Sequence, residues 1–297
     1  MPELPEVESL RRSLIPYLEG KRIESIEIKK PKLVSGNGTV RQESKGKVDE
    51  FINELTGEVF NKIERRAKNL IFEFESGKIL LVHLKMTGQL VYKDDDHFTF
   101  GGHPIEDSEH KLPHKHSHVI FKLNQGTLYY NDTRMFGYLL YFSSRKALEV
   151  ENHFEGLGIE PEDSGFTLEF FKKAMKKKSG TLKTLLLNQS VVVGLGNIYC
   201  DEACFEAGIL PDRKVNTLTD DELKNLYDAI TRIIPTAIEM GGSSVANYLL
   251  ADGSKGNYAR EHKVYLKGGK DCEICGNKLE KMKIASRTTV FCTTCQK

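Results

Sequence analysis

The chain has 297 residues, of which 39% are hydrophobic and 29% are charged, and its formal net charge at pH 7 is +1. This length allows about two or three domains with ordinary cores, and the small net charge excludes a chain that is basic as a whole. No apolar run approaches the ~20 residues of a membrane span and no apolar signal core follows the N-terminus, so we expect a cytoplasmic protein without membrane segments.

Charge is distributed unevenly along the chain. Residues 171–183 contain six lysines and no acid, and residues 255–297 contain ten Lys or Arg against four acids. Residues 94–110 have the opposite bias, with six acids and no Lys or Arg. A basic face is therefore the expected footprint of a nucleic-acid-binding surface.

The first eleven residues, MPELPEVESLR, can place a nucleophile at the N-terminus. Removal of Met1 would leave Pro2 as a secondary amine, and an α-amino group with a pKa of roughly 7.7–8.0 is partly uncharged near neutral pH. Such an amine can attack a sugar carbon and form an iminium, with Glu3 beside it as general acid or base. Pro5 suits the first turn of a helix that would hold the amine in place. The alternative is a plain helix start with acids in its first turn.

The first half of the chain predicts many short strands after this helix, because apolar and polar residues alternate in several runs. We expect strands at Arg22–Lys30, Glu58–Arg66, Asn69–Glu75, Lys78–Leu84, His118–Leu123, Gly126–Asn131 and Tyr138–Phe142, and a short helix at Val48–Leu55. Many short strands with a helix at each end predict a β-sandwich domain over residues 1–150.

From about Glu151 the pattern becomes helical. Helices are expected at Phe166–Lys178, Leu182–Leu187, within Gly194–Gly208, and from the capping box at Thr219 to about Met240. The overall prediction is an α+β multidomain fold. Its parts are the β-sandwich, a helical domain at residues 151–242, a long polar loop at 243–262 and a C-terminal segment at 263–297, which the cysteine spacing described next predicts to be a zinc finger.

The strongest chemical signal in the spacing is two Cys-x2-Cys pairs. Cys272 and Cys275 are separated from Cys292 and Cys295 by sixteen residues, which fits a β-hairpin closing on one Zn²⁺. Four thiolates fill the coordination shell, so the zinc would be structural. Disulfides are the alternative, and a cytosolic location disfavours them. The other two cysteines, at positions 200 and 204, are expected to be small buried hydrophobes.

The run PELPEVES at the N-terminus resembles the bacterial formamidopyrimidine-DNA glycosylase and endonuclease VIII family, and the resemblance covers nearly the whole chain. It implies that Pro2 is the catalytic amine, that Glu3 handles the proton transfers and that Glu6 supports it. The run Arg65-Arg66-Ala67-Lys68 is similar to the family's RRAK, whose lysine approaches the lesion. Arg287, in the run before Cys292, matches the arginine that binds phosphates beside the lesion and assists the second elimination.

The resemblance also implies a set of DNA contacts. The run HLKMTG at residues 83–88 and the run DTRMFG at residues 132–137 match the segments that insert Met86, Arg134 and Phe136 into the duplex. An apolar wedge can fill the gap left by an extruded base, and an arginine can bond the orphaned partner base. Core packing is the alternative for the two apolar side chains. His116 matches a DNA-contacting histidine, although four histidines between residues 110 and 118 also raise the possibility of a metal site.

The run VVGLGNIY at residues 192–199 resembles the signature of the family's helix–two-turns–helix unit, in which Asn197 is the phosphate-binding side chain. Glycines allow close approach of a backbone, and the following helix N-terminus offers N–H groups to a phosphate. Lys178 and Lys183 fall where the family has lysines near the DNA and the damaged base. The alternative for both is a solvated helix face.

The family resemblance implies a bifunctional DNA glycosylase and AP lyase of base excision repair. It would remove 8-oxoguanine and formamidopyrimidines through a Schiff base on Pro2, followed by β,δ-elimination. The expected partner is double-stranded DNA with oxidised bases or abasic sites, and the expected form is a bacterial cytoplasmic monomer with one structural Zn²⁺. Residues 243–262 resemble the lesion-capping loop of the purine-specific branch. The alternatives are an endonuclease VIII-like enzyme for oxidised pyrimidines and a non-catalytic zinc protein that binds damaged DNA.

Overall fold

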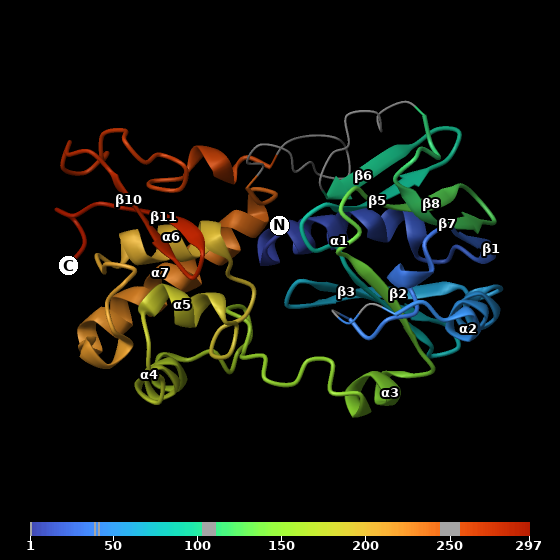
Figure 1. The fold of residues 1–297 in the computed structure, drawn as a ribbon, viewed down its shortest axis with the longest axis horizontal. Coiled ribbons are helices and arrows are strands. Elements are labelled where there is room, and N and C mark those ends of the chain that lie inside the picture. Colours follow the sequence, from blue (N-terminus) through green and yellow to red (C-terminus); the bar gives the residue numbers. More distant parts are fainter. Residues whose placement is uncertain (1, 39, 41, 103–110, 244–255) are drawn as a thin grey trace. The chain divides into compact units, whose positions relative to one another are not determined.

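The computed structural model describes residues 2–38, 40, 42–102, 111–243 and 256–297. The chain forms two compact units (Figure 1). Unit 1 consists of Met1–Phe154 and Gly241–Asn257, and unit 2 consists of Glu155–Met240 and Tyr258–Lys297. Within the described ranges, no helix is both long enough and apolar enough to cross a membrane.

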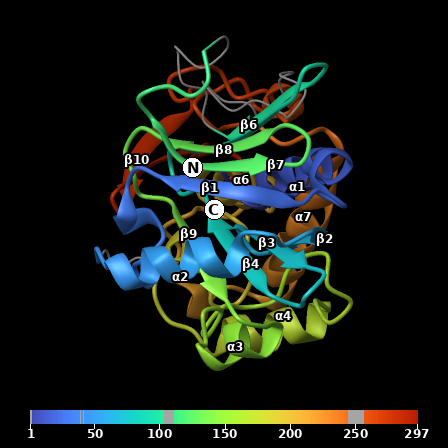
Figure 2. The ribbon, with the colours of Figure 1, turned by 90° about the vertical axis from the view of Figure 1, so that its right-hand side faces the viewer.

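Unit 1 contains two antiparallel sheets. Its strands are β1 (Ile23–Ile28), β2 (Phe60–Arg66), β3 (Asn69–Phe74), β4 (Ile79–His83), β5 (Gly88–Lys93), β6 (Phe98–Gly102), β7 (Ser117–Leu123), β8 (Thr127–Asp132) and β9 (Tyr138–Phe142). One sheet has five strands in the order β1-β7-β8-β5-β6, and the other has four in the order β2-β3-β4-β9. Figure 2 shows the five-stranded sheet above the four-stranded sheet.

The core of unit 1 joins both sheets to helix α1 (Leu4–Leu18). Val7, Leu10, Leu14 and Leu18 form the buried stripe of this helix, at the spacing that places side chains on one helical face. Phe72 on β3 and Phe121 on β7 belong to the same apolar cluster. The remaining elements of unit 1 are the 3₁₀ turn η1 (Pro31–Leu33) and the helices α2 (Lys45–Leu55) and α3 (Arg145–Val150).

Unit 2 is helical and ends in a strand pair. Its elements are α4 (Leu168–Lys176), α5 (Leu182–Leu187), α6 (Asn197–Glu206), η2 (Val215–Thr217), α7 (Asp220–Glu239), η3 (Tyr258–Arg260), β10 (Glu280–Ile284) and β11 (Arg287–Phe291). The capping box predicted for α7 is present, because Thr219 Oγ1 accepts the Glu222 N–H at 3.2 Å and Glu222 Oε2 accepts the Thr219 N–H at 2.8 Å. Phe205 of α6 packs with the apolar core of the strand pair.

The predicted α+β fold is confirmed, with antiparallel sheets, a helical part and a C-terminal strand pair that carries a cysteine cluster. Two strands were missed. Strand β5 is buried at five of its six positions, so it lacks the alternation that marks a half-exposed strand. Strand β6 lies inside the acidic segment 94–110 and ends in two glycines, which weaken any strand signal. Most of the predicted lesion-capping loop, residues 244–255, lies outside the described residues.

Candidate active site and DNA interface

The N-terminal segment is buried and anchored at Glu6. Pro2 and Glu3 are both buried, and Glu3 is the N-cap of α1. One oxygen of the Glu6 carboxylate accepts the Glu3 N–H at 2.8 Å, and the other accepts the Ser243 N–H at 2.7 Å. Gly242 has a positive φ of 78°, and a Cβ there would lie 2.7 Å from a Glu6 oxygen, so the position favours glycine. Glu6 therefore fixes the backbone next to Pro2 and Glu3.

Lys68 lies in the two-residue turn between β2 and β3. The turn requires a positive φ of 54° at Ala67, and the Arg66–Asn69 pair closes it. The Lys68 side chain is only 8% exposed. Arg65 stabilises the turn, because its Nη1 donates to the Ala67 carbonyl oxygen at 3.0 Å. Lys68, the predicted catalytic lysine, thus lies on a short turn that a side-chain hydrogen bond stabilises.

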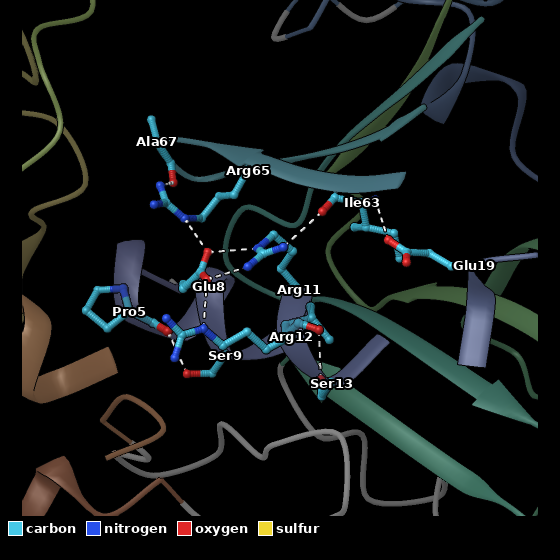
Figure 3. Close-up of polar contacts among 11 residues, drawn as sticks. Pro5, Glu8, Ser9, Arg11, Arg12, Ser13, Glu19, Ile63, Arg65 and Ala67 are labelled. Atoms are coloured by element: carbon cyan, nitrogen blue, oxygen red, sulfur yellow. Dashed lines mark hydrogen bonds and ion pairs between the residues drawn. The ribbon is translucent and has the colours of Figure 1, made fainter. Parts of the chain in front are cut away.

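Glu8, on α1, is surrounded by three arginines, of which Arg65 on β2 connects the helix to this turn (Figure 3). Its carboxylate accepts hydrogen bonds from Arg11 at 2.8 and 3.0 Å, from Arg12 at 2.9 Å and from Arg65 at 3.1 Å. Burial acts to raise the pKa of Glu8, but the bonds from Arg11 and Arg12 and the nearby positive charges outweigh it and lower the pKa to about 2. The sequence alone did not reveal this role of Glu8, since its partner Arg65 is 57 residues away.

We expect Glu8→Gln to lower the free energy of unfolding by about 3 kcal/mol at pH 7, since the pKa falls from 4.5 to about 2. A lowered folded-state pKa stabilises the fold above the unfolded value near pH 4.5 and loses that effect as the pH falls towards 2. Urea unfolding at several pH values measures this difference. The exposed Glu24→Gln variant is the control, and an equal loss at pH 7 and pH 2 would contradict the role of the charge.

The structure brings Met86, Arg134 and Phe136 together on two neighbouring loops. Met86 is 44% exposed and Phe136 is 46% exposed, which contradicts the alternative that they pack in the core. Arg134 Nη1 lies 3.2 Å from Met86 Sδ, and its guanidinium carbon lies 4.6 Å from the centre of the Phe136 ring. The three side chains form one exposed cluster, which we call the wedge.

Asp132, at the end of β8, holds the two wedge loops together. Its buried carboxylate accepts hydrogen bonds from the Thr87 hydroxyl, from the Arg134 N–H at 3.2 Å and from the Gly137 N–H at 2.8 Å. This role of Asp132 was not predicted, although Asp132 opens the run that carries Arg134 and Phe136. His116 lies at the same end of the sheet, because its carbonyl oxygen accepts the Asp132 N–H at 3.1 Å.

In unit 2, the predicted phosphate-binding residues Asn197 and Arg287 belong to neighbouring segments. Arg287 is exposed at the start of β11, directly after a tight turn in which Ala285 and Ser286 have positive φ. Asn197 begins α6, and its Nδ2 donates to the carbonyl oxygen of Thr288 at 3.0 Å. Among the described residues its Oδ1 is buried without a hydrogen-bond partner. The N-terminus of α6 and the tip of the strand pair are thus joined.

The prediction that Lys183 contacts DNA is corrected by its burial. Its side chain is fully buried, and its Nζ lies 2.5 Å from Asp201 Oδ1 and 2.8 Å from Thr289 Oγ1. Asp201 also accepts the Val290 N–H at 3.2 Å. Burial acts to raise the pKa of Asp201, and the Lys183 ammonium opposes this shift. An ammonium paired in this way cannot reach DNA without leaving its partner, so Lys183 stabilises the link between α5, α6 and β11.

The four cysteines of the predicted finger lie close together. The ligand atoms of Cys272, Cys275, Cys292 and Cys295 are all within 4.8 Å of one another. The pairs Cys272–Cys295 and Cys275–Cys292 have Sγ–Sγ distances of 3.8 and 3.5 Å. Tetrahedral zinc with bonds of about 2.3 Å requires sulfurs roughly 3.8 Å apart, so these residues fit one structural Zn²⁺. In the described part of the chain they are the only such group of potential metal ligands.

Helix α6 also anchors the segment that leads into the finger. The buried Glu202 carboxylate accepts the N–H groups of Lys263 at 2.7 Å, Val264 at 3.0 Å and Tyr265 at 2.8 Å. Together with Asp201, it ties the finger to α6 at both sides. The sequence did not reveal either acid, because the backbone N–H groups that they accept lie more than 60 residues away in the chain.

Three family models match the chain in succession. They are the formamidopyrimidine-DNA glycosylase N-terminal domain at residues 1–139, the formamidopyrimidine-DNA glycosylase H2TH domain at residues 157–248, and the zinc finger found in FPG and IleRS at residues 269–297. The order and positions of these matches agree with the sheets of unit 1, the helices of unit 2 and the cysteine cluster.

Full-length relatives give the same result. Formamidopyrimidine-DNA glycosylase of Desulfitobacterium hafniense is 38% identical over 296 residues, with 100% of both chains covered. A variant of the Lactococcus lactis FPG bound to DNA containing Fapy-dG has a TM-score of 0.85 at 35% identity, with 99% of both chains covered. A MutM structure with DNA containing carbocyclic 8-oxo-G has a TM-score of 0.84 at 34% identity, again with 99% of both chains covered. The chain therefore belongs to the formamidopyrimidine-DNA glycosylase family.

Proposed function

We propose that the chain is a bifunctional DNA glycosylase and AP lyase that removes oxidised purines from double-stranded DNA during base excision repair. The observation that carries this proposal is the anchored N-terminus. Pro2 and Glu3 lie buried at the start of α1, and Glu6 holds the adjacent backbone with both carboxylate oxygens. A nucleophilic amine works only when it is held at a fixed place, and this anchoring supplies that condition.

In the first half of the reaction the damaged nucleotide leaves the base stack, since its sugar carbon is inaccessible inside the duplex. The nitrogen of Pro2 forms a bond to C1′ while the bond from C1′ to the base breaks, and the base leaves with the proton that the Pro2 nitrogen gives up. Glu3 is the general acid that protonates the sugar ring oxygen as the ring opens to the iminium. We assign Glu6 a positioning role beside it, because both of its carboxylate oxygens accept backbone N–H groups.

In the second half of the reaction the iminium accepts the electron pair released when a C2′ proton is removed. The 3′ phosphate leaves in this β-elimination, and a second δ-elimination releases the 5′ phosphate. We assign Lys68 and Arg287 to the phosphates, because cations stabilise the charge that builds on each leaving group. Hydrolysis of the remaining iminium then frees Pro2 for another cycle.

The wedge would occupy the gap that the extruded nucleotide leaves. Met86 and Phe136 present exposed apolar surface, and Arg134 offers guanidinium donors to the orphaned base. His116, Lys178 and Asn197 are the further DNA contacts that we propose. The structural Zn²⁺ holds the strand pair of the finger, and so holds Arg287 at its tip.

The preference for oxidised purines is supported by two relatives whose structures contain Fapy-dG and 8-oxo-G in DNA. The sequence of residues 243–262 supports the same choice, because it resembles the lesion-capping loop of the purine branch. The endonuclease VIII-like alternative would prefer oxidised pyrimidines, and the non-catalytic alternative would bind damaged DNA without cutting it. We further propose that the protein acts in the cytoplasm as a monomer, next to the nucleoid that carries its substrate.

Single-turnover excision from two duplexes tests this proposal, one with 8-oxoguanine opposite cytosine and one with thymine glycol opposite adenine. We expect the first duplex to be cut at least roughly tenfold faster, as a site built for one base rejects another. Faster cutting at thymine glycol would move the chain to the pyrimidine branch. No cutting of either duplex or of an abasic site, with loss of Met1 verified by intact mass, would leave the non-catalytic alternative.

A further inference from the structure

One face of helix α4 packs against unit 2, and a second face forms ion pairs. Phe171 and Met175 are fully buried and hold the helix against unit 2. Lys172 and Lys176 form ion pairs with Asp220 in the first turn of α7, with N–O distances of 3.8 and 2.5 Å. Four residues of the helix are thus accounted for by packing and by pairing with the acidic start of α7.

The third face of α4 lines a pocket. Phe170, Lys173, Ala174 and Lys177 follow the i, i+3, i+4, i+7 spacing that places side chains on one stripe. They surround a cavity of about 380 Å³ together with Lys178, Ser190 and Val191. Lys177 is the C-cap of α4, directly after its last residue, Lys176. Phe170 is 40% exposed, so the pocket has one apolar wall that is open to solvent.

The charges around this pocket are uncompensated. In the described part of the chain, Lys173, Lys177 and Lys178 have no ion pair with a carboxylate, in contrast to Lys172 and Lys176 on the same helix. Three lysine side chains that line one cavity repel each other, and a bound anion offsets that repulsion. The pocket therefore has the charge of an anion site.

Ser190 supplies an unused hydrogen-bonding group at the same place. Its Oγ is buried and has no hydrogen-bond partner among the described residues. Buried hydroxyls nearly always have a partner, so this hydroxyl, on a residue that lines the cavity, is available to a group that binds there. Three ammonium groups and a hydroxyl match the acceptor oxygens of a phosphate group.

The pocket floor is firmly held. Gly158 N–H donates to the Gln189 carbonyl oxygen at 2.8 Å, and Ile159 N–H donates to the Val191 carbonyl oxygen at 3.1 Å. A Cβ at Gly158 would lie 2.2 Å from that same Val191 oxygen, so the two segments meet at their backbones. The floor then continues directly into the glycine-containing run that ends at Asn197.

We propose that this pocket binds a phosphate of the DNA backbone outside the lesion, with its sugar against Phe170 and Ala174. The proposal rests on the proposed function, because it takes DNA as the partner. DNA is favoured over a free anion because the pocket adjoins the run ending at Asn197, which we assign to phosphate binding. The exposed apolar wall beside the lysines can also contact a deoxyribose, whereas it makes no favourable contact with a free inorganic ion.

The test measures the salt dependence of binding to a duplex that contains a tetrahydrofuran abasic analogue, which cannot be excised. Each phosphate contact contributes about 0.9 to the slope of log K against log salt. The double variant Lys173→Gln/Lys177→Gln is expected to lower this slope by roughly 0.9–1.8. Lys172→Gln/Lys176→Gln removes the same charge from the same helix and is expected to keep the wild-type slope. Equal slopes for the two double variants would overturn the proposal.

A second measurement separates DNA from a free anion. Amide NMR signals of Ser190 and Lys177 are expected to shift when the duplex is added and to stay in place with inorganic phosphate alone at the same ionic strength. Shifts with inorganic phosphate but none with DNA would overturn the assignment to DNA. Both measurements use an uncleavable duplex, so they stand apart from the excision assay. A protein that fails to excise yet shows the slope difference keeps the pocket and loses only the proposed enzyme function.

Discussion

A chain with an extra residue retained ahead of Pro2 is expected to lose its strand-nicking activity by roughly 10³-fold or more, the scale of removing a catalytic nucleophile. The added peptide bond converts the secondary amine into an amide, whose nitrogen cannot attack C1′. Retention of Met1 has this effect, and so does a short tag in front of Pro2. Single-turnover nicking of an 8-oxoguanine duplex measures the loss.

The same tag attached after Lys297 is the matched control, and it is expected to leave nicking at the wild-type rate. DNA affinity for the uncleavable abasic analogue is expected to change much less than nicking, because the wedge and the lysine-lined pocket do not involve the amine. If the N-terminally tagged chain, with its extra residues verified by mass, nicks DNA at the wild-type rate, Pro2 is not the nucleophile.

The second large effect is expected from removing the zinc. Cys292→Ala deletes one of four ligands, and structural zinc contributes about 10–16 kcal/mol in isolated fingers, so the strand pair should lose its fold. Arg287 and its neighbours would then lose their fixed position. We expect DNA affinity to fall at least about tenfold, since hydrogen bonds to charged groups contribute about 1.5–3 kcal/mol each. Hydrogen exchange of the β10 and β11 amides and metal analysis measure the structural part.

Cys200→Ala is the control for this experiment, because Cys200 is equally buried but lies on α6 outside the metal cluster. It is expected to retain one zinc per chain and the protection of the β11 amides. Zinc at full occupancy and unchanged exchange in Cys292→Ala would show that the four cysteines do not form the metal site.

Short-range patterns predicted much of this molecule. The periodic apolar residues of α1 and the Cys-x2-Cys pairs are local features, and the structure has the helix and the cysteine cluster where they were expected. The capping box of α7 is local in the same sense. Strand β5 was missed for the opposite reason, because burial on both faces removes the alternation by which strands are recognised.

Contacts between residues far apart in the chain could not be predicted from the sequence. Lys183 stands in a lysine-rich run and was predicted to contact DNA, but its partner Asp201 is 18 residues away and Thr289 is 106 residues away. Glu8 fits a simple helix start, yet it joins α1 to the turn of Lys68 through Arg65. The wedge shows the same limit, because the contact between Met86 and Arg134 bridges 48 residues. Only the family resemblance placed those two side chains in one function.

Borohydride trapping tests whether the amine of Pro2 becomes covalently bonded to the sugar. The protein is mixed with the 8-oxoguanine duplex, reduced and digested, and the peptide that carries the nucleotide is identified by mass spectrometry. We expect the N-terminal peptide, with the DNA remnant on Pro2. Attachment to a lysine such as Lys68, or no adduct in a chain that lacks Met1 and binds DNA, would contradict it.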